Sequence, residues 1–241
     1  KSLYQNGYNI SVVFTQPPQK SHRGQKINKS PIQGISETLN IDYRTPKTLK
    51  DNHEEYEFLK ELNADLAIVC AYGQIIPENF LNLTKKGFVN IHASILPSWR
   101  GAAPIQRSIM NLDPETGISI MKIKKELDSG PVSNIYKIKI DQNQNAQEIS
   151  EKLSALAAEK ILDNVDDILE DKAKFIDQDH SKATYAKKID KEESRIDWDE
   201  DASKIIGKIN GLFPSPGASF SFNGERYKIL KAEIGNGIGQ V

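Results

Sequence analysis

The stretch NIHASILPSWRG, residues 90–101, places Asn90 and His92 two positions apart at the end of an apolar run. On a β-strand, side chains at positions i and i+2 point to the same face, so a strand here presents both residues together. The amide of Asn90 can donate a hydrogen bond to a developing oxyanion, and the imidazole of His92 can transfer a proton near neutral pH. A single histidine at a strand end is also compatible with a partly buried side chain that only packs.

A carboxylate that could orient the imidazole occurs further along the chain, in KKELDSGPV. Asp128 lies there in an Asp-Ser-Gly turn that follows the apolar run 117–123. A third group of this kind orients the base in many catalytic arrangements. Aspartate is also common in ordinary turns, so Asp128 alone decides little. We predict that Asn90, His92 and Asp128 act together as the catalytic residues.

Apolar runs and helical patterns alternate around these residues and predict an α/β fold. The alternation is typical of an open, mostly parallel, Rossmann-like sheet with helices on both faces. Such sheets bind ligands in the crevice at the carboxyl ends of their strands, where Asn90 and His92 would lie. The expected strands are 8–15, 65–71, 87–93, 117–123 and 132–140. The expected helices are 54–63, 102–110 and 145–171, with a further one at about 201–212.

The pattern becomes polar in the last third of the chain, which indicates a change of domain. We expect a first domain over 1–188, a linker over 189–200, and the beginning of a β-rich second domain over 201–241. In the last range, Asn223-Gly224 lies between two alternating runs and predicts a hairpin. Since the sequence opens without methionine and stops within a pattern, we expect the native protein to extend at both ends.

Composition and charge suit a globular protein of the cytoplasm. Hydrophobic residues make up 38% of the chain and charged residues 27%, which argues against disorder. No apolar run reaches the length of a membrane span, and no signal segment is recognisable. The one cysteine, Cys70, cannot form an internal disulfide, which fits a reducing compartment. The four histidines lack the paired spacing of metal ligands, so no metal site is expected.

Two longer stretches, NIHASILPSWRGAAPIQRSI and TGISIMKIKKELDSGPV, resemble the catalytic region of the folate-dependent formyltransferases. The resemblance implies transfer of a formyl group from 10-formyltetrahydrofolate to an amine, with Asn90, His92 and Asp128 as the catalytic set. It also implies a folate cleft lined by the segment after His92 and by AYGQIIP at 71–77, although the latter equally suits a turn that needs glycine. The implied folate-binding residues are Tyr72, Gly73, Ile75, Ser94, Ile95, Leu96 and Pro97.

Within that family, WRGAAPIQ and TYAKKIDKEESRIDW most resemble the members that formylate the α-amino group of initiator methionyl-tRNA in translation initiation. Their second domain is an OB-like barrel that helps to hold tRNA. The segment 16–31 is basic, contains no acidic residue and resembles their tRNA-contacting loop, although a solvated basic loop is the alternative. The net charge of −1 does not exclude such a local site. The implied tRNA-binding residues are Lys20, Arg23, Lys26, Lys29 and Arg100, with support of the folate loop as the alternative for Arg100 and its neighbour Trp99.

Three departures from the family pattern leave other functions open. The family's first strand and Gly-Thr-Pro turn are absent from the sequence, Ile95 replaces a more usual Leu, and Glu126 stands where the family usually has Gly. If that position needs a positive φ, Glu126 strains the loop before Asp128. The alternatives are a sugar-nucleotide N-formyltransferase, a formyltetrahydrofolate hydrolase, or a catalytically inactive tRNA-binding relative. We expect a monomer that binds tRNA and folate and no membrane.

Overall fold

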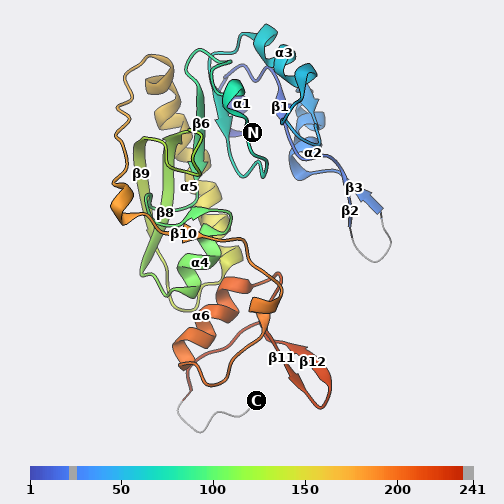
Figure 1. The fold of residues 1–241 in the computed structure, drawn as a ribbon, viewed down its shortest axis with the longest axis vertical. Helices are drawn as coiled ribbons and strands as arrows, with labels where there is room; N and C mark the ends of the chain where they lie inside the picture. The colour runs from blue at the N-terminus through green and yellow to red at the C-terminus, as the bar shows by residue number, and fades with distance from the viewer. Residues whose placement is uncertain (22–25, 236–241) are drawn as a thin grey trace.

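A four-stranded sheet lies at the centre of the computed structural model, which describes residues 1–21 and 26–235 (Figure 1). The strand order is β5–β6–β8–β9; β5 and β6 are parallel, and β8 runs antiparallel to both of its neighbours. The short connection between β8 and β9 explains their antiparallel pairing, since a parallel pair needs a longer crossover. The predicted α/β class is confirmed. The strands are β5 (Ala67–Val69), β6 (Phe88–His92), β8 (Glu115–Lys122) and β9 (Val132–Lys139).

A second, two-stranded parallel sheet pairs β1 (Val13–Phe14) with β4 (Tyr43–Arg44). The helix α2 (Pro31–Leu39), which the sequence patterns did not predict, connects the two strands. Its N-cap Ser30 accepts a hydrogen bond from the backbone N–H of Gln33 at 3.0 Å, and proline is favoured at its first position.

The basic segment between β1 and α2 contains the arms of a small hairpin. β2 (Gln19–Ser21) and β3 (Lys26–Asn28) are antiparallel, and they project from the body of the molecule beside α2 (Figure 1). The expected strand 8–15 is accordingly reduced to the two residues of β1, and the chain turns into this projection soon afterwards.

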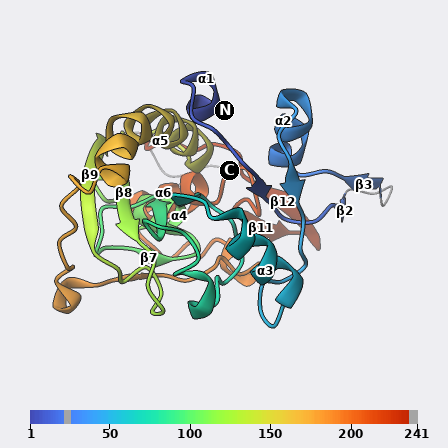
Figure 2. The same ribbon diagram turned by 90° about the horizontal axis from the view of Figure 1, so that it is seen from above.

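Helices cover the sheet and supply its apolar core. The longest, α5 (Ala146–Leu169), begins with a capping box between Asn145 and Glu148, in which each side chain accepts from the other residue's backbone N–H. Ile149 and Leu153 of this helix are at most 3% exposed, and Figure 2 shows α5 lying along β8 and β9. The expected helices are confirmed close to their bounds. The others in this part are α1 (Ser2–Gln5), α3 (His53–Leu62) and α4 (Pro104–Met110).

The C-terminal part begins with α6 (Ala202–Leu212), which packs against α4. Gly207 and Gly211 permit the close approach of the two helices. A Cβ on Gly211 would lie 2.6 Å from Cγ of Met110, nearer than side-chain carbons pack. The contact therefore requires glycine at this position.

A hairpin follows α6, as the sequence predicts (Figure 1). β11 (Ser219–Phe222) and β12 (Glu225–Lys228) are antiparallel and are joined by Asn223 and Gly224. These two residues have φ values of 50° and 81°, which are the left-handed values that a two-residue type I′ turn requires.

The polar segment between α5 and α6 packs back onto the central sheet. Its strand β10 (Tyr185–Ala186) lies parallel to β7 (Arg100–Gly101), the short strand that follows the loop after β6. The single-turn 3-10 helices are η1 (Glu78–Phe80), η2 (His180–Lys182) and η3 (Glu192–Ser194).

Candidate active site

Strand β6 presents Asn90 and His92 on one side of the sheet. Asn90 pairs with Met121 of β8, and His92 pairs with Ser119, so the two residues are alternate positions of one regular strand. The side chain of His92 is 6% exposed, whereas Asn90 is half-buried. The shared face inferred from their spacing is therefore available for chemistry at the end of the strand.

Both nitrogen atoms of the His92 imidazole face an oxygen acceptor. Nε2 lies 2.9 Å from the carbonyl oxygen of Trp99, and Nδ1 lies 3.6 Å from Oδ2 of Asp128. A neutral imidazole can donate to only one of these acceptors, whereas an imidazolium can donate to both. The hydrogen bond to Trp99 fixes the ring, and Asp128 faces Nδ1 as a charge partner for the protonated ring.

Asp128 reaches His92 from an unusual backbone conformation. Its φ is 46°, in the left-handed region that few residues other than glycine adopt. Its Oδ2 accepts a hydrogen bond from the backbone N–H of Gly101 at 2.9 Å, which fixes the carboxylate against β7. The strain considered at Glu126 is not found, because among the described residues the positive φ of this loop falls on Asp128 itself.

Arg100 corrects one expectation from the sequence. Its side chain was among those assigned to tRNA, but Arg100 is only 3% exposed. Its Nε and Nη2 donate to Oε1 of Gln178 at 3.1 and 2.7 Å, and Nη2 lies 3.2 Å from Nδ1 of His180. Arg100 therefore supports the loop after β6 from inside and is not accessible to a nucleic acid.

Gln178 is the residue of this region that the sequence patterns missed. It is 8% exposed, and its Nε2 donates to the carbonyl oxygens of Asp128 at 2.9 Å and Gly130 at 2.7 Å. The surrounding segment is polar and gives no periodic signal. No local pattern could have linked Gln178 to a turn 50 residues earlier.

Trp99 holds the loop after β6 through three groups. Its backbone N–H donates to Oγ1 of Thr184 at 2.8 Å, its indole N–H donates to Oδ2 of Asp113 at 2.6 Å, and its carbonyl faces His92. Its φ of 62° is again left-handed. Trp99 is therefore a support of the loop, which is one of the two roles considered from the sequence.

The residues expected to bind folate divide into two groups. Ser94 and Leu96 are buried, at 0% and 4% exposure; Ser94 donates its hydroxyl to the carbonyl of Ser98, and the N–H of Leu96 donates to Oγ of Ser119. Their side chains therefore shape the loop and cannot line an open cleft, which corrects the expectation. Gly73 and Ile75 are exposed, and Tyr72, Ile95 and Pro97 are half-buried.

Tyr72 has a side-chain oxygen that is buried and has no hydrogen-bond partner among the described residues. Burial, with a smaller contribution from Glu55, raises the pKa of Tyr72 to about 12. The Oε1 atom of Gln74, two residues later, is also buried without a partner in the described chain. The loop after β5 thus carries two polar atoms that a bound molecule could satisfy.

Of the basic residues expected to contact tRNA, Lys20 lies on β2, Lys26 lies on β3, and Lys29 directly follows β3. Lys29 is described, and its Nζ lies 2.9 Å from Oε1 of Glu37. That hydrogen bond and the charge of Glu37 raise the pKa of Lys29. Arg23 lies outside the described residues, and of Lys20 and Lys26 only the backbone is described.

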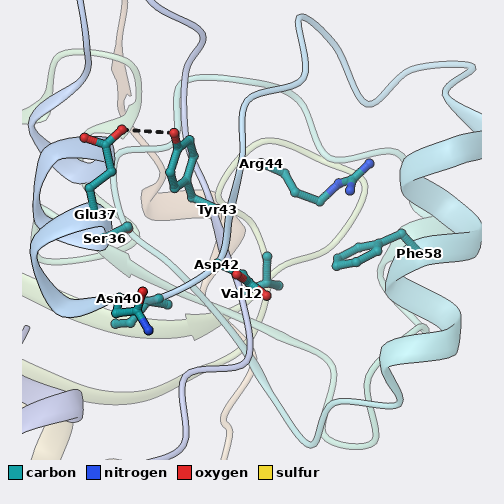
Figure 3. Close-up of a pocket in the computed structure, with 9 residues that line it drawn as sticks. Val12, Ser36, Glu37, Asn40, Asp42, Tyr43, Arg44 and Phe58 are labelled. Atoms are coloured by element: carbon teal, nitrogen blue, oxygen red, sulfur yellow. Dashed lines mark hydrogen bonds between the residues drawn. The ribbon is translucent and has the colours of Figure 1, made fainter.

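The structure also contains two cavities away from the His92 side chain. One, of about 460 Å³, lies beside β4 between α2 and α3, where Glu37 accepts a hydrogen bond from the Tyr43 hydroxyl and Arg44 faces Phe58 (Figure 3). The other, of about 730 Å³, is lined by five lysines, whose charged groups contact carboxylates or an aromatic ring. Those lysines are Lys85, Lys86, Lys122, Lys124 and Lys125.

Residues 1–21 and 26–235 contain neither a metal-binding cluster nor a membrane-spanning helix. No three His, Cys, Asp or Glu side chains there gather closely enough to hold a metal ion. No helix in these ranges has the length and apolar character needed to cross a membrane.

Known proteins resemble this chain over its whole length. Residues 1–165 match the family described as formyl transferase, and residues 188–241 match the formyl transferase C-terminal domain. A methionyl-tRNA formyltransferase of Pelagibacter ubique is 66% identical over 241 residues, which are 100% of this chain and 78% of the relative. That of Dictyoglomus turgidum is 44% identical over 226 residues, covering 94% of this chain and 72% of the relative.

Solved structures share the fold at much lower identity. A sugar N-formyltransferase from a Shewanella species superimposes with a TM-score of 0.69 at 22% identity, over 87% of this chain and 84% of that one. A sugar 3N-formyltransferase, solved with dTDP and 5-N-formyl-THF, gives a TM-score of 0.69 at 18% identity, over 96% of this chain and 88% of that one. At these identities the likeness concerns the fold alone.

Proposed function

This chain belongs to the formyl transferase family, and we propose that it transfers the formyl group of 10-formyltetrahydrofolate to the α-amino group of initiator methionyl-tRNA. The observation that carries the proposal is the convergence of an amide, an imidazole and a carboxylate at the end of β6. His92 and Asp128 come from separate segments and face each other at 3.6 Å. Asn90 lies on the same strand as His92.

The three side chains divide the chemistry of transfer to an amine. Negative charge develops on the oxygen of the formyl group when the methionyl amine attacks the formyl carbon. The side-chain amide of Asn90 is a donor suited to that oxygen. The attacking nitrogen must lose a proton, and Nδ1 of His92 is the atom that can take it, because Nε2 donates to the carbonyl of Trp99. The proton would then pass to the folate nitrogen as its bond to the formyl carbon breaks. Asp128, whose Oδ2 lies 3.6 Å from Nδ1, stabilises the imidazolium that results.

The residues around the loop after β5 fit a folate. Ile75 is 88% exposed and Leu127, next to Asp128, is 61% exposed, so both offer apolar surface to the flat faces of a ring system. The unpartnered polar atoms of Tyr72 and Gln74 suit its polar edge. Bound there, 10-formyltetrahydrofolate supplies the formyl group, and Ile75, Ile95 and Tyr72 would hold it.

The basic β2–β3 projection is proposed to contact phosphates of the tRNA acceptor end. Lysine and arginine contacts of this kind position a nucleic acid and weaken steeply as salt rises. Lys29 would exchange its partner Glu37 for a phosphate, while Arg23, Lys20 and Lys26 remain assigned on the sequence resemblance. Action on tRNA also implies a protein of the cytoplasm, and we propose that it works as a monomer.

A comparison of formyl acceptors tests the function. The protein as its gene encodes it is incubated with 10-formyltetrahydrofolate and, separately, with initiator methionyl-tRNA, a nucleotide-linked amino sugar, or no acceptor. We expect formyl-methionyl-tRNA to form fastest, with little formylated sugar and little free formate. Faster formylation of the amino sugar, or release of formate without an acceptor, would replace the proposal by one of the two alternative enzymes.

A further inference from the structure

We propose that Gln178 is a positioning residue that holds Asp128 in its working conformation, an inference that deepens the proposed transfer and rests on it. Gln178 does not reach the face of β6 where the reaction is proposed. It contacts the backbone of the turn that carries Asp128, through hydrogen bonds from Nε2 to the carbonyl oxygens of Asp128 and Gly130. These bonds fix the peptide planes on the C-terminal side of the carboxylate.

The turn needs such an anchor because its conformation is unfavourable. Asp128 has a φ of 46°, a conformation in which a side-chain-bearing residue loses stability relative to its ordinary ones. Gly130 is pressed against the neighbouring strand so closely that a Cβ there would lie 1.8 Å from the carbonyl oxygen of Lys122. Two backbone hydrogen bonds from one buried side chain hold both positions at once.

The orientation of the Gln178 amide is itself determined by its surroundings. Oε1 accepts two hydrogen bonds from the guanidinium of Arg100, and Nε2 faces two carbonyl oxygens. A flipped amide would place N–H groups against the guanidinium and oxygen against both carbonyls. Because Gln178 and Arg100 are 8% and 3% exposed, water has little access to relieve such contacts. Arg100 therefore orients Gln178, and Gln178 orients Asp128.

The substitution Gln178→Glu separates positioning from packing. It keeps the size of the side chain and an acceptor for Arg100, and it removes both donors to the turn. A displacement of about 1 Å at a reacting group costs on the order of 10²-fold in rate. We expect kcat for formyl-methionyl-tRNA to fall about 10- to 100-fold, with KM for folate and tRNA within about threefold. The exposed Gln142 provides the matched control, Gln142→Glu, which should leave kcat unchanged.

Two further measurements exclude a general loss of structure. If Gln178 acts only through Asp128, the double variant Gln178→Glu/Asp128→Asn should be as active as Asp128→Asn alone, whereas independent effects would multiply. Hydrogen exchange gives a readout without catalysis: the N–H of Gly101 donates to Asp128 Oδ2 and should exchange faster in Gln178→Glu. The N–H of Ala102, which donates to the carbonyl of Ala186 at 2.9 Å, should be unaffected.

The outcomes are distinct. Normal kcat in Gln178→Glu, losses that multiply in the double variant, or equal acceleration of exchange at Gly101 and Ala102 would each overturn the positioning role. A wild-type protein that formylates no methionyl-tRNA would instead refute the proposed function, and the exchange experiment would still test the contact. If Gln178→Glu does not fold, the same measurements apply to Gln178→Met, which keeps the length of the side chain and removes all four hydrogen bonds.

Discussion

Replacing Asp128 with Asn removes a negative charge from a position where only 15% of the side chain is exposed. The oxygen that carries the charge lies 3.6 Å from Nδ1 of His92. For unit charges at this separation, an effective dielectric constant of about 20 gives an attraction of about 5 kcal/mol. This attraction exists only when the imidazole is protonated, which is the state that follows proton transfer. Since a factor of ten in rate corresponds to about 1.4 kcal/mol, we expect kcat to fall about 10³- to 10⁴-fold.

Steady-state formylation of methionyl-tRNA measures this effect, with each substrate varied in turn. We expect KM for both substrates to change by less than about threefold, because an interaction made only in the transition state lowers kcat and leaves binding intact. The fold should persist, since an amide oxygen on residue 128 can still accept from the N–H of Gly101. A melting curve close to that of the wild type would establish this.

Asp177→Asn is the matched control. Oδ1 of Asp177 also lies 3.6 Å from a basic nitrogen, Nζ of Lys124, but these two side chains are 81% and 53% exposed. Exposed ion pairs contribute about 0–1 kcal/mol, so this variant should have normal kcat. Near-normal turnover in Asp128→Asn, or a loss of equal size in Asp177→Asn, would refute the assignment of Asp128 to catalysis.

Three further predictions concern groups around the site and between the two parts of the chain. Trp99→Phe removes the indole hydrogen bond to Asp113 and should lower the free energy of unfolding in urea by about 1.5–3 kcal/mol. It should also lower kcat, because the loop that it loosens carries the backbone carbonyl that faces His92. Unchanged stability and rate would contradict this. The pKa of Tyr72 is raised from about 10 to about 12, so its contribution to stability is complete below pH 10 and is lost as pH rises from 10 to 12. Tyr72→Phe should abolish that alkaline loss, which thermal unfolding at several pH values measures. The hydrogen bond from Arg107 lowers the pKa of Glu193, so the stability that this pair gives is present above the ordinary pKa of Glu and is lost as pH falls through the lowered pKa. Arg107→Ala should therefore reduce the loss of stability at acid pH. An unchanged loss would exclude this pair as the cause of the acid dependence.

Local signals predicted much of the fold, and α2, the longer of two helices that they missed in the described chain, shows where they fail. The helices α3, α4 and α5 and the turn at Asn223-Gly224 follow from spacing and turn chemistry close to the residues themselves. In α2, the exposed side chains include the apolar Ile32 and Ile35, at 48% and 40%, and the buried ones are the polar Gln33 and Ser36. This inverts the pattern by which a surface helix is recognised. Their donor groups find partners inside: the Ser36 hydroxyl donates to the carbonyl of Ile32 and Nε2 of Gln33 donates to Glu37, although Oε1 of Gln33 is buried without a partner among the described residues.

The candidate site was predictable where its members lie on one strand or in a typical turn. Asn90, His92 and Asp128 are of this kind. The burial of Arg100 and the contacts of Gln178 could not be predicted, because they join residues 78 positions apart in a segment without periodicity. Family resemblance identified which residues to compare, but the direction in which Arg100 points depends on the packing of β7 against β10.

The pairing of β7 with β10 has a consequence for synthesis on the ribosome. Arg100 and Gln178 are 78 residues apart, so translation at about 5–20 residues per second separates their appearance by about 4–16 s. While the last 50 of these residues are made, the nascent chain contains His92 and Asp128 but lacks Gln178, Thr184 and Ala186, which hold the loops around them. The order of synthesis therefore delays the completed arrangement until all of the first family-matched region, residues 1–165, and part of the segment after it have been made.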